Sequence, residues 1–228
     1  NISEVFSGDE TYRRTFQIER KKNSEASPGL AELAKGFASQ NQVSSGRVKG
    51  LFVAREEAWP ESLNSKTLRE DKTVVWTAGL ATWKKLAERG VWVHGSTEGL
   101  GETEDSRLEV LNEESIDWMK FSHDQVGDGA LAIYSLHTEV LDDHALRSVR
   151  FYFWRSGTQF RAALKAAVSD SAVAKAMKTG YHGVGPGRSS KTVREGLGPL
   201  GLNEDDLKNR FAIFYNEADF LKKIGLGK

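Results

Sequence analysis

The sequence has no cysteine among its 228 residues. This absence excludes a disulfide framework, cysteine-ligated zinc, iron–sulfur centres and thiol catalysis. It also agrees with a reducing compartment, so we expect a cytoplasmic protein.

Long apolar segments are missing as well. No run of about 18 apolar residues occurs, so no membrane-spanning helix is expected. The opening NISEVFSGDE does not have the pattern of a signal peptide. Because the chain starts on Asn and not on Met, we expect a processed product or a fragment cut from a longer polypeptide.

Neither sign of charge is in excess. The 32 Lys and Arg residues balance the 32 Asp and Glu residues, and the formal net charge is zero. Neither a nucleic acid nor a membrane is therefore expected as the main partner. Hydrophobic residues make up 39% of the chain and charged residues 28%, which is typical of a globular protein with one large or two small domains.

The first 47 residues are polar. The pattern predicts a strand at about 12–20, a short helix at 27–39 and a linker at 39–47. The predicted helix places four apolar residues on one face, namely Leu30, Leu33, Ala34 and Phe37.

From residue 48 onwards, apolar runs of strand type alternate with amphipathic segments of helix type. The predicted strands are 48–54, 73–78, 91–95, 115–122, 130–138 and 149–154. The predicted helices are 82–89, with Trp83, Leu86 and Ala87 facing inward, and 158–168, with Phe160, Ala163, Leu164 and Ala167 facing inward. Buried strands separated by helices predict an α/β protein with mostly parallel sheets.

One pattern occurs twice. LFVAREEAWPESL (51–63) precedes VVWTAGLATWKKLAERG (74–90), and FYFWRSGTQFRAAL (151–164) precedes GYHGVGPGRSSKTVREGLG (180–198). Each copy has an aromatic strand with an arginine, a helix, and then a glycine turn with hydroxyl residues and a basic helix. The continuations WVHGSTEGLGE (92–102) and AIFYNEADFLKKI (212–224) also correspond. This predicts a duplicated α/β unit and two similar lobes facing each other across a cleft.

The glycine turns suit an anionic ligand. A glycine before a helix lets backbone N–H groups approach a ligand, and the helix N-terminus adds unpaired donors and a positive dipole end. Thr82 follows Gly79 in this way, and Ser189 and Ser190 follow Gly185. The alternative is structural, because Ser and Thr are common helix caps in any α/β protein.

Other common site motifs are absent. The segment 183–187, GVGPG, does not continue as a dinucleotide fingerprint, and GPGRSSK (185–191) lacks the spacing of a phosphate-binding P-loop. The two histidines and three acids of 137–144 have no standard metal-site spacing, and G-x-S-x-G does not occur. No metal site is expected.

Five segments together resemble the uroporphyrinogen-III synthase family: AGLATWKKLAERG (78–90), VGPGRSSKTVREGLG (184–198), YFWRSG (152–157), AIYSLHT (132–138) and GSTEGL (95–100). The resemblance covers about residues 48–224. It implies two α/β lobes with mostly parallel sheets, joined by a two-stranded linker with a cleft between them. The inner lobe would be 48–137, and the outer lobe would be 1–47 plus 141–228.

Two features depart from the family pattern. Only QVGDG (125–129) stands where the family has a helix between two strands, and Trp154 and Arg155 replace small residues. These departures leave open a second interpretation, a non-catalytic tetrapyrrole-binding or interaction domain attached to a pathway enzyme. A third is an unrelated two-lobe protein that binds a small molecule.

The resemblance implies a cofactor-free lyase of heme biosynthesis. Such an enzyme cyclises hydroxymethylbilane to uroporphyrinogen III, inverting the last pyrrole ring and losing water. Tyr134 would assist departure of the hydroxyl group. The substrate carboxylates would be held by Gly79, Thr82, Ser96, Thr97, Arg155, Ser156, Gly157, Gly185, Arg188, Ser189 and Ser190. Hydroxymethylbilane synthase is the expected fusion or contact partner.

Overall fold

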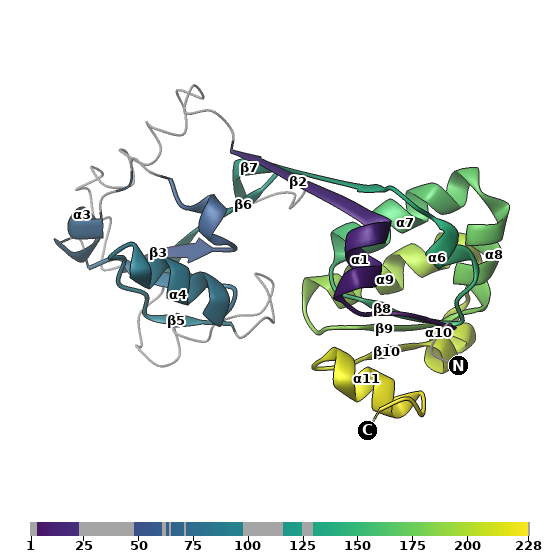
Figure 1. Cartoon of the computed structure of the whole chain (residues 1–228). Helices are drawn as coiled ribbons and strands as arrows, with labels where there is room; N and C mark the ends of the chain where they lie inside the picture. Colours follow the sequence, from purple (N-terminus) through teal and green to yellow (C-terminus); the bar gives the residue numbers. More distant parts are fainter. Residues whose placement is uncertain are drawn as a thin grey trace. The chain divides into compact units, whose positions relative to one another are not determined.

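A computed structural model describes residues 4–22, 48–60, 63, 65–70, 72–97, 116–124 and 130–227 (Figure 1). The chain divides into two compact units, which we call unit 1 (Asn1–Ile18 with His137–Lys228) and unit 2 (Glu19–Leu136). The chain passes from unit 1 to unit 2 within β2 (Phe16–Lys22) and returns within β7 (Ala130–Val140). These two strands are hydrogen-bonded neighbours.

Unit 1 is built on a parallel four-stranded sheet in the order β1-β8-β9-β10. Its strands are β1 (Val5–Phe6), β8 (Phe151–Trp154), β9 (Tyr181–Val184) and β10 (Phe211–Ile213). A helix follows the carboxyl end of each strand: α1 (Asp9–Thr15), α7 (Gly157–Ser169), α9 (Arg188–Leu197) and α11 (Glu217–Lys223). The remaining helices are α6 (His144–Arg147), α8 (Ser171–Thr179), η3 (Gly198–Leu200) and α10 (Glu204–Arg210).

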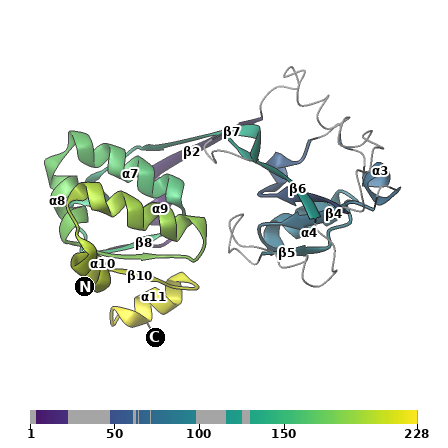
Figure 2. The ribbon, with the colours of Figure 1, turned by 180° about the vertical axis from the view of Figure 1, so that it is seen from behind.

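Both faces of this sheet are covered, which explains why β8 is aromatic throughout. Trp154 packs edge-on against Phe160 of α7, with ring centroids 5.2 Å apart. On the other face Phe153 contacts Phe220 of α11 at 5.4 Å. Figure 2 shows α7 and α9 on one side of the strands and α11 on the other.

Unit 2 carries a six-stranded sheet in the order β2-β7-β6-β3-β4-β5. Its further strands are β3 (Val48–Val53), β4 (Val74–Thr77), β5 (Gly95–Ser96) and β6 (Ile116–His123), and its helices are η2 (Glu56–Ala58), α3 (Ser65–Glu70) and α4 (Leu80–Glu88). The run β7-β6-β3-β4-β5 is parallel. The prediction of an α/β protein with mostly parallel pairing is thus confirmed.

The two copies of the sequence repeat supply a pair of neighbouring parallel strands in each sheet. These are β3 and β4, flanked by β6 and β5, and β8 and β9, flanked by β1 and β10. Val53 pairs with Thr77 where Trp154 pairs with Val184. In this register Arg155 is the first residue after β8, whereas Arg55 is the second residue after β3. The two arginines are therefore not at equivalent positions of the repeat.

The predicted strand at 12–20 is wrong in its first half, because α1 extends to Thr15 and β2 begins at Phe16. Alternating polarity concealed a short helix whose charges suit its dipole, with acidic residues in the first turn and basic residues in the last. Its i,i+4 ion pairs, Asp9 with Arg13 and Glu10 with Arg14, lie at 3.7 and 3.9 Å.

Other elements differ in detail. Of the predicted strand 91–95 only Gly95 is strand, although Val91 and Val93 are buried. In α4 Leu86 is fully buried as expected, but Trp83 is half-buried and Ala87 is exposed, so the inward face is narrower than predicted. In α7 the inward positions are confirmed except Leu164, which is only partly buried. Helix α8 was not predicted.

Strands β6 and β7 pair in parallel even though only residues 124–129 separate them, with Lys120 opposite Ala130 and His123 opposite Tyr134. A parallel crossover usually takes a dozen residues or more. The segment 125–129, which stands where the resembling family has a helix, lies outside the described residues. The predicted helix 27–39 and the predicted linker 39–47 lie outside them too. Among the helices that the structure describes, none has the length and apolar character to cross a membrane.

Candidate functional site

In unit 1 the loops after β8 and β9 meet at the carboxyl edge of the sheet. The N–H of Gly157 donates a hydrogen bond to Ser189 Oγ at 3.2 Å. Ser156 caps α7, its Oγ accepting from the Gln159 N–H at 3.3 Å. A Cβ on Gly157 would lie only 3.0 Å from the side chain of Thr192, so glycine permits this close approach. Three of the predicted site residues are therefore brought together.

The start of α9 forms the second part of this edge. Gly187, the N-cap of α9, has φ of +85°, a conformation that favours glycine. Ser190 Oγ donates to the Gly187 carbonyl at 2.7 Å, which holds the turn closed. At Gly185 an added Cβ would meet no atom within 4 Å, so the backbone there faces open space. The first-turn amides of α9 carry the positive end of the helix dipole.

Two arginines lie near this helix start. Arg188 is the first residue of α9, and Arg161 comes from α7. Desolvation lowers the pKa of Arg161, and the positive charge of Arg188 lowers it further. An anion bound near Arg161 would offset this repulsion. Sequence reasoning identified Arg188 but missed Arg161. Arg161 follows Gly157 by one helical turn, and this spacing could have indicated that it lies near the same sheet edge.

Arg155 has protein partners. Its guanidinium hydrogen-bonds the carboxylates of Asp9 and, at 2.8 Å, Glu217, and it stacks 4.4 Å from the centre of the Tyr12 ring. Partial burial lowers the pKa of Arg155, but its two carboxylate partners outweigh burial and raise it. The Gly8 N–H also donates to Glu217, at 2.5 Å. Arg155 thus links the loops after β1, β8 and β10, and its charge is compensated inside the protein.

In unit 2 the corresponding hydroxyls bind backbone carbonyls. Thr97 Oγ1 donates to the Ala78 carbonyl at 3.1 Å, and Thr82 Oγ1 lies 3.5 Å from the Ala54 carbonyl. Gly79 has φ of −172°, an extended conformation open to any residue. The structure of unit 2 itself therefore accounts for the hydroxyls of Thr82 and Thr97 and for the backbone at Gly79. Ser96 is half-buried at the end of β5.

Tyr134 is fully buried in β7. Its ring centre lies 5.7 Å from that of His123 on the neighbouring strand. Sequence reasoning assigned it a hydrogen-bonding role at the substrate, and such a role requires that its hydroxyl become accessible.

The predicted site residues divide between the units. Those of unit 1 share one sheet edge: Arg155, Ser156, Gly157, Gly185, Arg188, Ser189 and Ser190. Those of unit 2 lie in or beside its sheet: Gly79, Thr82, Ser96, Thr97 and Tyr134. Within the described part of the chain, no three His, Asp or Glu side chains are grouped so that they could hold a metal ion. No protein-family model and no curated protein sequence matches the chain.

Proposed function

We propose that the chain is a uroporphyrinogen-III synthase, which closes linear hydroxymethylbilane with inversion of the last pyrrole ring and loss of water. The order of the five resembling segments supports this function. The strand order supports it as well, because one copy of the repeated motif supplies a pair of neighbouring strands in each sheet, β3-β4 and β8-β9.

The proposed architecture is two similar lobes joined by a two-stranded linker, with the substrate in a cleft between them. The pairing of β2 with β7 supports the linker, since the chain passes between the units within both strands. Hydroxymethylbilane synthase is the enzyme that would supply the substrate.

The observation that carries the proposal is the positive edge of unit 1. Arg188 is the first residue of α9, Arg161 of α7 is close enough for the charge of Arg188 to lower its pKa, and an added Cβ on Gly185 would meet no atom within 4 Å. A guanidinium binds a carboxylate through two parallel hydrogen bonds, and helix amides bind anions without a charged side chain. A polycarboxylate is therefore the class of substrate that this edge suits.

The reaction requires little acid or base from the protein. The terminal hydroxyl leaves as water, and the enzyme must fold the substrate so that the correct carbons meet. In the proposed mechanism Arg161, Arg188 and the α9 amides hold carboxylates of the substrate. Gly79, Thr82, Ser96 and Thr97 of unit 2 would hold others, and Tyr134 would assist hydroxyl departure.

A second candidate is tetrapyrrole binding without turnover. Two observations favour it: Tyr134 is fully buried, and Arg155 is already paired with Asp9 and Glu217. Both groups were expected to act on the substrate, and neither presents its functional atoms without a rearrangement.

The test is the product of the purified chain with hydroxymethylbilane, separated into ring isomers by chromatography. The synthase function predicts the type III isomer. Only the type I isomer, which forms without a catalyst, would overturn it. Calorimetric titration with uroporphyrinogen then identifies the second candidate, for which we expect binding without turnover.

A matched pair of variants on α9 tests the positive edge. Arg188→Met should lower kcat/KM by about 10- to 100-fold, the loss expected for one charged hydrogen-bonding partner. Arg194→Met is the control, because Arg194 lies near the other end of the same helix and pairs with Glu204 at 2.8 Å. Equal activity of the two variants would contradict the assignment.

A further inference from the structure

Unit 2 has a pocket of about 430 Å³ at the amino ends of β4 and β5. It lies between α3 and the segment 91–94, at the opposite edge of the sheet from Gly79 and Thr82. Ligand pockets have volumes of roughly 300 to 1,000 Å³, so this one is large enough for a two-ring molecule. The floor is apolar and includes Leu68 and Val75, both buried.

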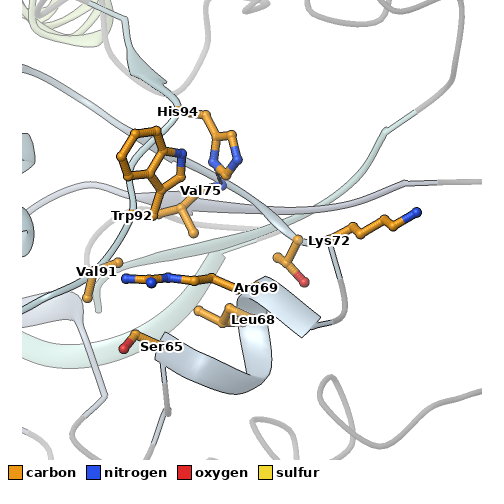
Figure 3. Close-up of a pocket in the computed structure, with 9 residues that line it drawn as sticks. Ser65, Leu68, Arg69, Lys72, Val75, Val91, Trp92 and His94 are labelled. Atoms are coloured by element: carbon orange, nitrogen blue, oxygen red, sulfur yellow. Dashed lines mark hydrogen bonds between the residues drawn. The ribbon is translucent and has the colours of Figure 1, made fainter.

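The walls of the pocket are aromatic and cationic. Figure 3 shows Trp92 and His94 on the segment after α4, opposite Leu68 and Arg69 of α3. Trp92 is 65% exposed, an unusual position for the largest aromatic side chain unless a ligand covers it. Among the described lining residues there are two basic side chains, Arg69 and Lys72, and no acidic one. The pocket therefore favours an anion.

The polar groups of the pocket have defined geometry. Arg69 Nη2 donates to the Gly90 carbonyl at 3.1 Å, which uses one of five guanidinium N–H donors and fixes the side chain across the pocket. His94 Nδ1 accepts from the Val75 N–H at 3.0 Å, so its other ring nitrogen carries the proton and is a donor. Figure 3 shows the Lys72 side chain extending away from the other sticks.

Lys72 has an unusual backbone. Its φ is +53°, the one positive value among the described residues other than glycine. The Thr73 N–H donates to the Leu68 carbonyl at 2.9 Å, and the Lys72 N–H to the Arg69 carbonyl at 3.1 Å, the bonds of a helix end that normally uses glycine. Non-glycine residues in this conformation are strained and are often found at functional sites. A lysine at this position therefore carries a cost in stability.

We infer that this pocket binds a small aromatic anion, a carboxylate or phosphate group joined to a flat ring system. Arg69 and the ring N–H of His94 hold the anionic group, the positive charge of Lys72 adds to the attraction, and Trp92 stacks on the ring. The site shares no residue with the positive edge of unit 1, so its test does not depend on the proposed synthase function.

Calorimetric titration of the full chain with 1-naphthoate and 1-naphthyl phosphate tests the inference, with neutral 1-naphthalenemethanol as the control ligand. We expect one molecule of an anionic probe per chain and at least tenfold weaker binding of the neutral one. The stronger of the two anions identifies the carboxylate or the phosphate class. Absence of binding by both anions, or equal binding of the neutral probe, overturns the inference.

Variants then locate the site. Arg69→Met and Trp92→Ala should each weaken binding about tenfold, and Lys84→Met, at an exposed position of α4, should leave it unchanged. Because Trp92 is 65% exposed, Trp92→Ala should not lower the unfolding midpoint, so its loss of binding cannot be ascribed to misfolding. Unchanged affinity in both pocket variants would show that the probes bind elsewhere.

Discussion

The indole N–H of Trp154 donates a hydrogen bond to His182 Nδ1 at 3.0 Å, and both side chains are fully buried in unit 1. The other ring nitrogen of His182 lies 2.8 Å from the Met177 carbonyl and therefore carries the proton. The His182 ring also stacks on Tyr152, with centroids 4.9 Å apart and planes within 7°. This arrangement needs a neutral histidine, because a protonated Nδ1 could not accept from Trp154.

This pair predicts acid sensitivity. Burial is the main reason that the pKa of His182 falls to about 4; the charge of Arg210 acts in the same direction and the bond to Met177 opposes it. Because the pKa is lower in the folded chain than its ordinary 6.5, the stabilisation is complete above pH 6.5 and is lost as the pH falls towards 4. We expect unfolding free energy to fall by about 3 kcal/mol over this window, measured by denaturant unfolding at each pH.

Two variants separate His182 from other titrating groups. His182→Phe should lower stability at pH 7, because Trp154 loses its acceptor, and should remove about one proton from the pH dependence. His144→Gln, on the exposed helix α6, should keep the wild-type dependence. If His182→Phe retains the full slope between pH 6.5 and 4, other groups cause it.

Two glycines on either side of one strand end predict opposite results. A Cβ on Gly183 would overlap the Phe220 ring, whereas one on Gly185 would meet no atom within 4 Å. Gly183→Ala should therefore lose about 1 to 3 kcal/mol through overpacking, and Gly185→Ala should stay within about 0.5 kcal/mol. Denaturant unfolding measures both, and similar losses in the two variants would contradict this packing.

Local patterns predicted most of the alternating elements of this fold. The apolar runs 48–54 and 73–78 correspond to β3 and β4. Parallel strands buried on both faces are continuous apolar runs, and such runs are recognisable in the sequence. The helix α1 was missed because the sequence of a seven-residue helix differs little from a strand pattern of alternating polarity. Its i,i+4 ion pairs form only once the helix has formed. The positions of strands and helices along the chain were predicted better than the contacts that their residues make.

The sites show the same limit. Gly157 and Ser189 were both predicted to bind the substrate, and the structure joins them by a hydrogen bond. The partners of Arg155 could not be predicted, because Asp9 and Glu217 are remote in sequence and meet it only through the sheet. The pocket beside Trp92 carries no motif, since it depends on how α3 packs against the segment 91–94.

The network around Arg155 predicts a measurable shift at Asp9. The hydrogen bond from Arg155 and its positive charge are the main causes that hold the pKa of Asp9 below its ordinary value. In Arg155→Met this pKa should rise towards 3.8, as followed by carboxyl NMR during an acid titration. Arg13→Met is the matched control, because Arg13 contributes least to the shift and its pair with Asp9 is longer, at 3.7 Å. A larger rise of the Asp9 pKa in Arg13→Met than in Arg155→Met would contradict this assignment to Arg155.

The helix end at Lys72 predicts a stabilising substitution. Lys72 adopts φ of +53° at the position after α3 where glycine is usual, and this conformation costs a lysine about 1 kcal/mol that glycine does not pay. Lys72→Gly should therefore raise the unfolding free energy, while Lys72→Ala should not, because alanine keeps the strain. If the charge of Lys72 contributes to the pocket, Lys72→Gly should also bind 1-naphthoate several-fold more weakly despite its greater stability. A variant that is both more stable and equally good at binding would leave the strain at Lys72 without a functional explanation and would remove Lys72 from the site.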